Sequence, residues 1–252
     1  MTEPGPDALV LAVAVVFARV GGVFMIAPGL SSMRAPVQVK LFVALGIALA
    51  VAPLVLDRAV EAVGQATPGD LVAVLVTETI IGFLIGLLSR CLMMALQTIS
   101  VGIANAIGLG GVPGLTLEAG EQGQAAATLF MATATVIIFV ADLHYEILRA
   151  LVGSYRVLAP GAVLDVRQAL VSVTDQLAAA FFVALRLAAP FLIYSVVVNF
   201  AIGITNKLTP SIPVFFVSLP FVTAGGLIMM ALAIREVMVA FSDAFRQLTG
   251  AL

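Results

Sequence analysis

The sequence predicts an all-α, membrane-associated protein, and three observations support that fold class. Hydrophobic residues make up 62% of the chain and charged residues only 10%, whereas an ordinary globular domain is roughly 45–50% apolar. The apolar residues gather in about six long runs. No run alternates apolar and polar residues as a barrel strand does. Because backbone polar groups in lipid must be satisfied within their own segment, the runs are expected to be helices.

The runs are separated by polar stretches or by clusters of proline and glycine, and they lie at residues 8–27, 39–56, 71–106, 125–143, 177–204 and 214–241. They are not equal membrane spans. The third would extend ~54 Å as a continuous helix, which is nearly twice the ~30 Å thickness of a hydrocarbon core. A simple bundle of membrane-spanning helices therefore fits the sequence poorly.

Charged side chains lie inside several of these runs, namely Arg19, Glu78, Arg90 and Arg186. An arginine that faces lipid at the bilayer centre costs at least ~2.5–3.5 kcal/mol. We therefore expect these side chains to face protein or water. The lysines and arginines between the runs leave the orientation in the membrane open.

Proline and glycine should shape the helices. Pro53, Pro190 and Pro220 lie inside apolar runs, and each removes a helical hydrogen bond, so bent or broken helices are expected there. Gly82 and Gly86 form a GxxxG pattern in the third run. This spacing lets a second helix approach closely.

The segment 105–124 is the one long glycine-rich interruption between apolar runs, and five of its glycines lie at 108, 110, 111, 114 and 120, together with Pro113. Glycine and proline disfavour helix, so a loop is expected. Its ionisable residues are Glu118 and Glu121, and without a lysine it cannot be a phosphate-binding loop of the Walker type. The residues alone leave two interpretations open. The segment is either a surface loop, or a loop whose backbone packs closely against other elements in a partly hydrated site.

The residues that enzymes and metal sites require are scarce. His144 is the only histidine and Cys91 the only cysteine, which excludes multi-histidine and cysteine-cluster metal sites. No GxSxG elbow is present. The net charge of −2, without a basic cluster, argues against binding of nucleic acid. The sequence therefore predicts a protein that is not an enzyme and that needs no cofactor or metal.

Several motifs, spread over nearly the whole chain, together resemble the family of the flagellar biosynthetic protein FliR and its counterpart in virulence type III secretion. The matching residues are Arg19, Pro28, Lys40, Glu78, Gly82, Gly86, His144, Ser154, Pro160, Gly161, Gly203, Asn206, Pro210, Phe215 and Pro220. The most specific block is NFAIGITNKLTPSIPVFFVSLP, residues 199–220.

The chain departs from the family pattern in two places. Lys207 stands where the family usually has arginine, Ser211 where it has glutamine, and Pro213 where it often has asparagine or serine. The central loop has Leu117-Glu118 in the region of the family's Asp-Pro pair. Since lysine cannot form the bidentate fork of arginine, the local geometry at Lys207 should differ.

The resemblance implies a non-enzymatic, pore-forming subunit of the type III export gate in the bacterial inner membrane, which passes unfolded proteins. Its implied partners are several copies of a P subunit, a Q subunit and the B-type export switch protein. Residues 1–175 would be the P-like helical part and residues 176–252 the Q-like C-terminal hairpin. The helices would form bent hairpins that are largely enclosed by partner subunits.

The resemblance also gives the segment 105–124 a role, because the family's central loop enters the pore as a plug. The implied plug residues are Leu109, Gly110, Gly111, Val112, Pro113, Gly114, Leu115, Thr116, Leu117 and Glu118. The resemblance also implies a set of assembly or structural residues: Arg19, Pro28, Lys40, Glu78, Gly82, Gly86, His144, Gly203, Asn206, Lys207, Pro210, Phe215 and Pro220.

A small proton-coupled secondary transporter is the alternative function. Glu78 or Asp142 would then carry the proton, since an ionisable group within a membrane segment often marks an ion path. The two halves of the sequence show no echo of an inverted repeat. A transporter should behave as a stable monomer or small homo-oligomer in detergent, whereas an export-gate subunit should need its P and Q partners.

Overall fold

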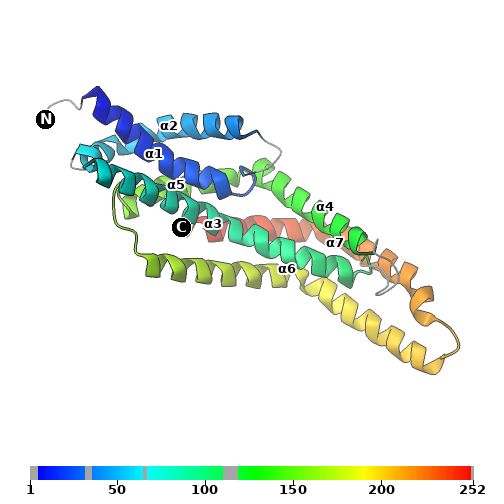
Figure 1. Cartoon of the computed structure of the whole chain (residues 1–252). Coiled ribbons are helices and arrows are strands. Elements are labelled where there is room, and N and C mark those ends of the chain that lie inside the picture. Colours follow the sequence, from blue (N-terminus) through cyan, green and yellow to red (C-terminus); the bar gives the residue numbers. More distant parts are fainter. Residues whose placement is uncertain (1–4, 32–35, 65–66, 110–118, 251–252) are drawn as a thin grey trace. The chain divides into compact units, whose positions relative to one another are not determined.

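The computed structural model describes residues 5–31, 36–64, 67–109 and 119–250. These residues form seven α-helices and no strand (Figure 1), so the predicted all-α fold class is confirmed. The helices are α1 (Pro6–Ile26), α2 (Val37–Gly64), α3 (Pro68–Ala106), α4 (Ala119–Val140), α5 (His144–Val157), α6 (Val166–Leu208) and α7 (Val214–Gly250). Within the described residues, α1, α2, α3, α6 and α7 are each long and apolar enough to cross a membrane.

Each predicted apolar run corresponds to one helix, but none of the predicted runs corresponds to α5. This helix is amphipathic, with Ile147, Leu151 and Tyr155 buried and Arg149 and Arg156 exposed. A search for uniformly apolar runs passes over such a segment. The apolar spacing of three to four residues would have revealed it.

The interior prolines break no helix. Pro53, Pro190 and Pro220 lie inside α2, α6 and α7, which continue past them. A broken helix is therefore the wrong prediction at these positions, whereas a bend at each proline stays a prediction. Each proline removes a single hydrogen bond, and helices of 28, 43 and 37 residues retain many others.

The central interruption is shorter than the predicted 105–124. Helix α3 continues to Ala106, and α4 already begins at Ala119. Alanine and glutamine are good helix formers, and those in residues 119–127 outweigh a cost of about 1 kcal/mol for each of the two glycines there. The predicted plug residues from Gly110 to Glu118 lie outside the described residues.

Helix α3 ends in a Schellman motif centred on Gly108. The Gly108 N–H donates to the Asn105 carbonyl (3.1 Å) and the Leu109 N–H to the Ala104 carbonyl (2.9 Å). Gly108 has a φ of +82°, the left-handed conformation that favours glycine at this position. This glycine therefore ends the helix, as the sequence suggested.

The chain divides into two compact units. The first comprises Met1–Cys91, Ile138–Ala178 and Phe245–Leu252, and the second comprises Leu92–Ile137 and Ala179–Ala244. In the first unit, α1 packs against α2, which buries a stripe of small residues that includes Ala44, Ala48 and Val51. The predicted division at 175/176 concerns likeness to other subunits, and it stays a prediction.

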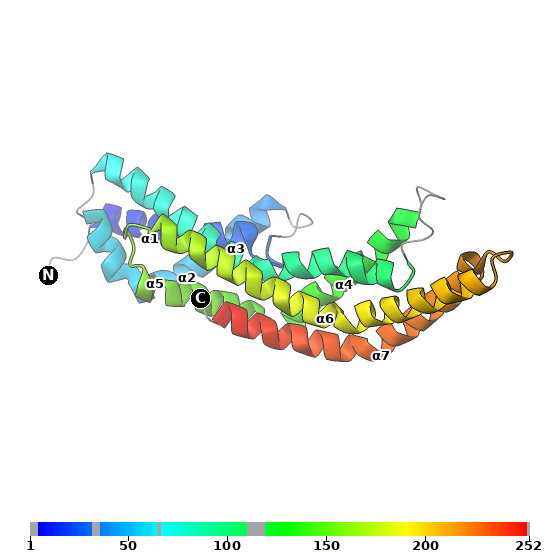
Figure 2. The ribbon, with the colours of Figure 1, turned by 90° about the horizontal axis from the view of Figure 1, so that it is seen from below.

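The second unit contains most of the α6–α7 hairpin, whose two helices run side by side in Figures 1 and 2. The Tyr194 hydroxyl donates to the Val222 carbonyl (2.7 Å). Opposite, the end of α3 reaches α7. There the Thr223 hydroxyl donates to the Gly108 carbonyl (3.4 Å), and a Cβ at Gly226 would lie 3.0 Å from the Ile107 Cα. Helix α7 thus holds the last turn of α3.

Candidate functional site

Helices α1 and α3 cross in backbone contact at a cluster of glycines. A Cβ built on Gly22 would lie 2.5 Å from the Thr79 carbonyl oxygen, and one built on Gly82 would collide with the Arg19 carbonyl. One turn further along α3, a Cβ on Gly86 would lie 3.0 Å from the Val23 carbonyl oxygen. Helix α1 is therefore the close neighbour of the GxxxG pattern.

This crossing brings two charged side chains together in the interior. Arg19 lies one turn before Gly22, and Glu78 lies one turn before Gly82. The Arg19 Nε–H donates to Glu78 Oε2 (2.6 Å), and an Nη2–H donates to Oε1 (3.0 Å). Both side chains have an exposed fraction of 0%. The pair is a bidentate, buried ion pair, the strong class of charge-assisted contact.

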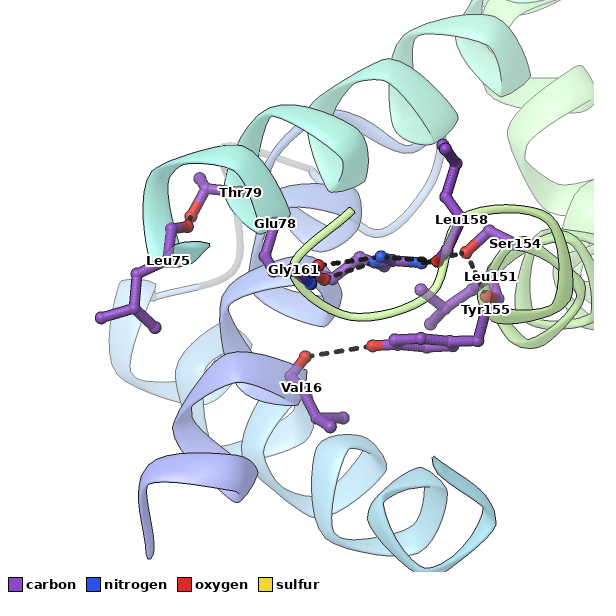
Figure 3. Close-up of polar contacts among 10 residues, drawn as sticks. Val16, Leu75, Glu78, Thr79, Leu151, Ser154, Tyr155, Leu158 and Gly161 are labelled. Atoms are coloured by element: carbon purple, nitrogen blue, oxygen red, sulfur yellow. Dashed lines mark hydrogen bonds and ion pairs between the residues drawn. The ribbon is translucent and has the colours of Figure 1, made fainter. Parts of the chain in front are cut away.

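The end of α5 satisfies the rest of the guanidinium. Arg19 Nη1 donates to the Ser154 hydroxyl and to the Leu158 carbonyl, each at 3.0 Å. Nη2 also donates to the Leu158 carbonyl (3.0 Å). An arginine has five N–H donors, and each of those of Arg19 has an acceptor. Figure 3 shows Glu78, Ser154 and Leu158 gathered at one place between α3 and the end of α5.

Two further contacts complete the cluster. The Gly161 N–H donates to Glu78 Oε1 (3.1 Å), which ties the α5–α6 connection to α3. The Tyr155 ring lies against the guanidinium, 4.1 Å from Arg19 Cζ to the ring centroid, in a cation–π arrangement. In the described part of the chain, no buried side-chain nitrogen or oxygen lacks a hydrogen-bond partner. The Arg19 cluster, meaning Arg19, Glu78, Ser154, Tyr155, Leu158 and Gly161, is thus fully satisfied.

The other predicted residues of the first unit lie outside the contacts of the Arg19 cluster. Pro28 is buried just after α1. Lys40 donates from Nζ to the Ser31 carbonyl (3.3 Å). His144 begins α5, and its Nδ1 lies 3.3 Å from the Ile138 carbonyl oxygen. Its ring lies near that of Tyr145, with 4.3 Å between the centroids.

The block 199–220 forms the end of α6, the α6–α7 connection and the start of α7. Its predicted residues are largely exposed: Gly203, Asn206, Lys207, Pro210, Phe215 and Pro220. Within the described chain, the side chains of Asn206 and Lys207 make no hydrogen bond. They are therefore available to another molecule.

Sequence reasoning missed two contributors to the Arg19 cluster, the Tyr155 ring and the Leu158 carbonyl. Tyr155 could have been found from the amphipathic spacing of α5, since it continues the buried face of Ile147 and Leu151. The role of the Leu158 carbonyl could not be predicted from the sequence, because every residue has a backbone carbonyl. The position of this carbonyl depends on where the chain leaves α5.

Two of the interior arginines behave differently from Arg19. Arg90 in α3 and Arg186 in α6 are exposed on the surface of this chain, although apolar residues flank both. The most apolar stretch of α7 is also only 6% buried, and that of α6 only 22%. The chain alone therefore leaves both apolar and cationic surfaces on long helices uncovered.

A metal centre has no candidate among the residues that the structure describes, where no group of three or more histidine, cysteine, aspartate or glutamate side chains could hold an ion. The Glu78 carboxylate is already occupied by three N–H donors. The chemistry of the Arg19 cluster is therefore structural, since it joins α1, α3 and the α5–α6 connection.

Comparison with known proteins gives two matches along nearly the full chain. The family model described as bacterial export proteins, family 1, matches residues 10–248. The flagellar biosynthetic protein FliR of Caulobacter vibrioides is 30% identical over 237 residues, which cover 93% of each chain. The family-model match includes the Arg19 cluster and nearly all of the α6–α7 hairpin.

Proposed function

Because the chain belongs to the bacterial export proteins, family 1, we propose that it is a non-enzymatic subunit of a type III protein export apparatus, of the flagellar kind or its virulence counterpart. It helps to form and seal the channel for unfolded proteins in the bacterial inner membrane. The family match and the likeness to a flagellar biosynthetic protein support this proposal.

The uncovered surface of the long helices is the structural observation that carries the proposal. An isolated arginine that faces lipid is costly, yet Arg90 and Arg186 are exposed within apolar helices. Neighbouring subunits can cover the apolar surface and supply carboxylates or carbonyls to these arginines. We assign this cover to several copies of the P subunit and to the Q subunit, with the B-type export switch protein as a further partner. In this assembly, residues 1–175 would occupy a position like that of a P subunit, and residues 176–252 a position like that of a Q subunit.

The proton-coupled transporter is less well supported by the geometry. Glu78 is fully buried, and both of its oxygens accept hydrogen bonds from Arg19. With both oxygens bound and no exposed surface, this carboxylate is out of direct contact with bulk water. Asp142, the other candidate, is exposed in the turn between α4 and α5, outside the long apolar helices. Neither residue has the setting of a gated proton carrier.

Co-purification tests the proposed function. Expressed alone, the chain is expected to aggregate after extraction, because the apolar surfaces of α6 and α7 lack their cover. Expressed with the P and Q subunits, it should enter a discrete complex with several P copies for one copy of this chain, measured by native mass spectrometry. A monodisperse monomer obtained without partners would contradict the proposal and favour the transporter.

The central segment supplies a second test. We propose that residues 109–118 lie in the closed pore, where apolar side chains such as Leu115 and Leu117 make a dry constriction. Deleting Gly111–Thr116 is then expected to leave assembly intact but to increase the conductance of the purified complex in planar bilayers for small ions. The matched control is the full-length complex in the same lipid. Equal conductance of the two complexes would mean that the segment is only a surface connection.

A further inference from the structure

The α6–α7 hairpin contains a half without any charged residue. In α6, no aspartate, glutamate, lysine or arginine occurs at residues 187–206, and in α7 none occurs at residues 214–234. These two stretches, the outer hairpin, lead to the α6–α7 connection and run side by side in Figures 1 and 2. At ~1.5 Å per residue each is ~30 Å long, which equals the ~30 Å thickness of a hydrocarbon core. The whole of α6, with 43 residues, is about twice as long as that core.

Charged residues lie at both ends of the outer hairpin. The hydrogen bond between Tyr194 and Val222 sets the register of the two helices. On one side of this contact, Arg186 lies about two turns from Tyr194 and Arg235 about three and a half turns from Val222, so their depths differ by only ~8 Å. The headgroup region on each side of the hydrocarbon core has a similar thickness of ~5–8 Å. At the other end, by the α6–α7 connection, Lys207 is exposed.

The outer hairpin presents large apolar side chains to its surroundings. Val196 and Phe200 of α6 and Phe221 and Ile228 of α7 are 63–75% exposed. Leaving such surface in water costs about 25 cal/mol for each Å², and soluble proteins rarely expose large continuous apolar patches. This surface therefore needs an apolar environment.

The polar side chains of the outer hairpin donate their hydrogen bonds within the chain. The Asn199 amide nitrogen donates to the carbonyl oxygen (2.8 Å) and the hydroxyl oxygen (3.1 Å) of Ser195. The hydroxyls of Thr205 and Ser218 donate to carbonyls of their own helices, at 2.9 Å and 3.0 Å. Tyr194 donates across the hairpin. A segment in lipid must satisfy its polar groups in this way, because hydrocarbon offers no acceptor.

We propose that the outer hairpin lies in the hydrocarbon layer of the membrane and contacts phospholipid acyl chains. Arg186 and Arg235 then lie at one headgroup layer and Lys207 at the other, where long cationic side chains reach phosphate and water. The remaining parts of α6 and α7, which carry Asp175 and Asp243, lie outside the hydrocarbon. The inference rests on the proposed place of the chain in a membrane and not on the identity of its partner subunits. Neighbouring subunits cover part of the outer hairpin, and lipid covers the rest.

A complete cover of protein fits these observations less well. A protein interface can pair a charge with a partner group, so it does not require uncharged stretches of bilayer length in both helices. Helix–helix contacts in membranes favour small residues, whereas Phe200, Phe221 and Ile228 are large and exposed. The length, the charge pattern and the internal hydrogen bonds together favour lipid.

Spin-label accessibility tests the proposed depth in the full complex, co-expressed with the P and Q subunits and placed in phospholipid nanodiscs. Single cysteines replace three exposed residues: Val171 in the first part of α6, Val196 in the outer hairpin and Ile212 in the α6–α7 connection. Each cysteine carries a nitroxide, and its collisions with oxygen and with a water-soluble nickel chelate are measured. The unsubstituted chain, whose Cys91 is buried, is the blank for labelling.

The ratio of oxygen to nickel collisions at residue 196 should exceed the ratios at residues 171 and 212 about tenfold, because the polar chelate is excluded from hydrocarbon. Equal ratios at residues 171 and 196 would overturn the inference. So would low collision rates with both reagents at residue 196, which would indicate a cover of protein. If the expected profile appears in a chain that does not co-purify with the P and Q subunits, the proposed function is contradicted and this inference is supported.

A matched pair of substitutions gives a second readout. Val196→Asp places a carboxylate near the middle of the outer hairpin, far from either headgroup layer, and should lower the amount of chain in the membrane fraction about tenfold. Val171→Asp, at an exposed valine of the same helix, should accumulate as the unsubstituted chain does. Normal accumulation of Val196→Asp, or an equal loss for both variants, would contradict the proposed depth.

Discussion

Replacing Arg19 with leucine is expected to prevent accumulation of the folded chain. The substitution leaves the buried Glu78 carboxylate with one remaining donor, the Gly161 N–H, and leaves the Leu158 carbonyl without its two arginine donors. Removing one partner of a buried ion pair costs about 3–5 kcal/mol, against a total stability of only about 5–15 kcal/mol for a typical domain. The measurement is the amount of chain in the membrane fraction and in the co-purified complex.

Arg149→Leu is the matched control for Arg19→Leu. Arg149 pairs with Glu146 at 2.9 Å, but its side chain is 75% exposed. Such surface pairs contribute about 0–1 kcal/mol, so this variant should accumulate normally. The double variant Arg19→Met, Glu78→Met should recover part of the loss, since two apolar side chains leave no buried charge. Equal accumulation of Arg19→Leu and Arg149→Leu would show that the Arg19 cluster does not support the fold.

Arg19→Lys separates the role of charge from that of geometry. Lysine keeps the positive charge but has three donors on one nitrogen, without the planar fork of arginine. It cannot reach Glu78, Ser154 and Leu158 in the observed arrangement. Its accumulation should therefore lie between those of the wild type and Arg19→Leu.

The second large effect is expected from alanine at Gly82. The new Cβ would collide with the Arg19 carbonyl, where neither helix backbone can yield without moving the other. Overpacking of this kind costs about 1–3 kcal/mol, and separation of α1 from α3 would also disturb the pairing of Arg19 with Glu78. Thermal unfolding of the purified complex, followed by circular dichroism, should show a lower midpoint.

Gly102→Ala on the same helix should have the opposite sign. Gly102 lies inside α3, and no atom lies within 4 Å of a Cβ built there. Alanine in place of glycine in a helix interior is favourable by up to about 1 kcal/mol. If the two substitutions shift the midpoint equally, the close approach of α1 and α3 does not determine stability at Gly82.

The sequence predicted what must be true of certain residues, but not which residues would meet. The cost of an unpaired charge required partners or water for Arg19 and Glu78, and the GxxxG pattern marked the α3 face that accepts another helix. That Gly22 on α1 meets Gly82 could not be predicted, because the pattern on α3 names no partner. The Leu158 carbonyl is common to every residue type, so its place in the cluster is a property of the folded chain alone.

The limits of the helices show the same difference. Apolar runs located the long helices, because lipid-compatible segments must be helical throughout. The beginning of α4 was missed because glycines at 120 and 123 counted too heavily against the alanines around them.

The Arg19 cluster also constrains how the chain is made. Arg19 leaves the ribosome 59 residues before Glu78 and 139 residues before Leu158. At roughly 5–20 residues per second, about ten seconds separate the synthesis of Arg19 from that of Leu158, its last acceptor. During that interval the Arg19 charge on α1 is not neutralised, so we expect α1 to stay near the membrane surface or the insertion machinery. We therefore expect the first helix to reach its final packing only after the α5–α6 connection has been synthesised.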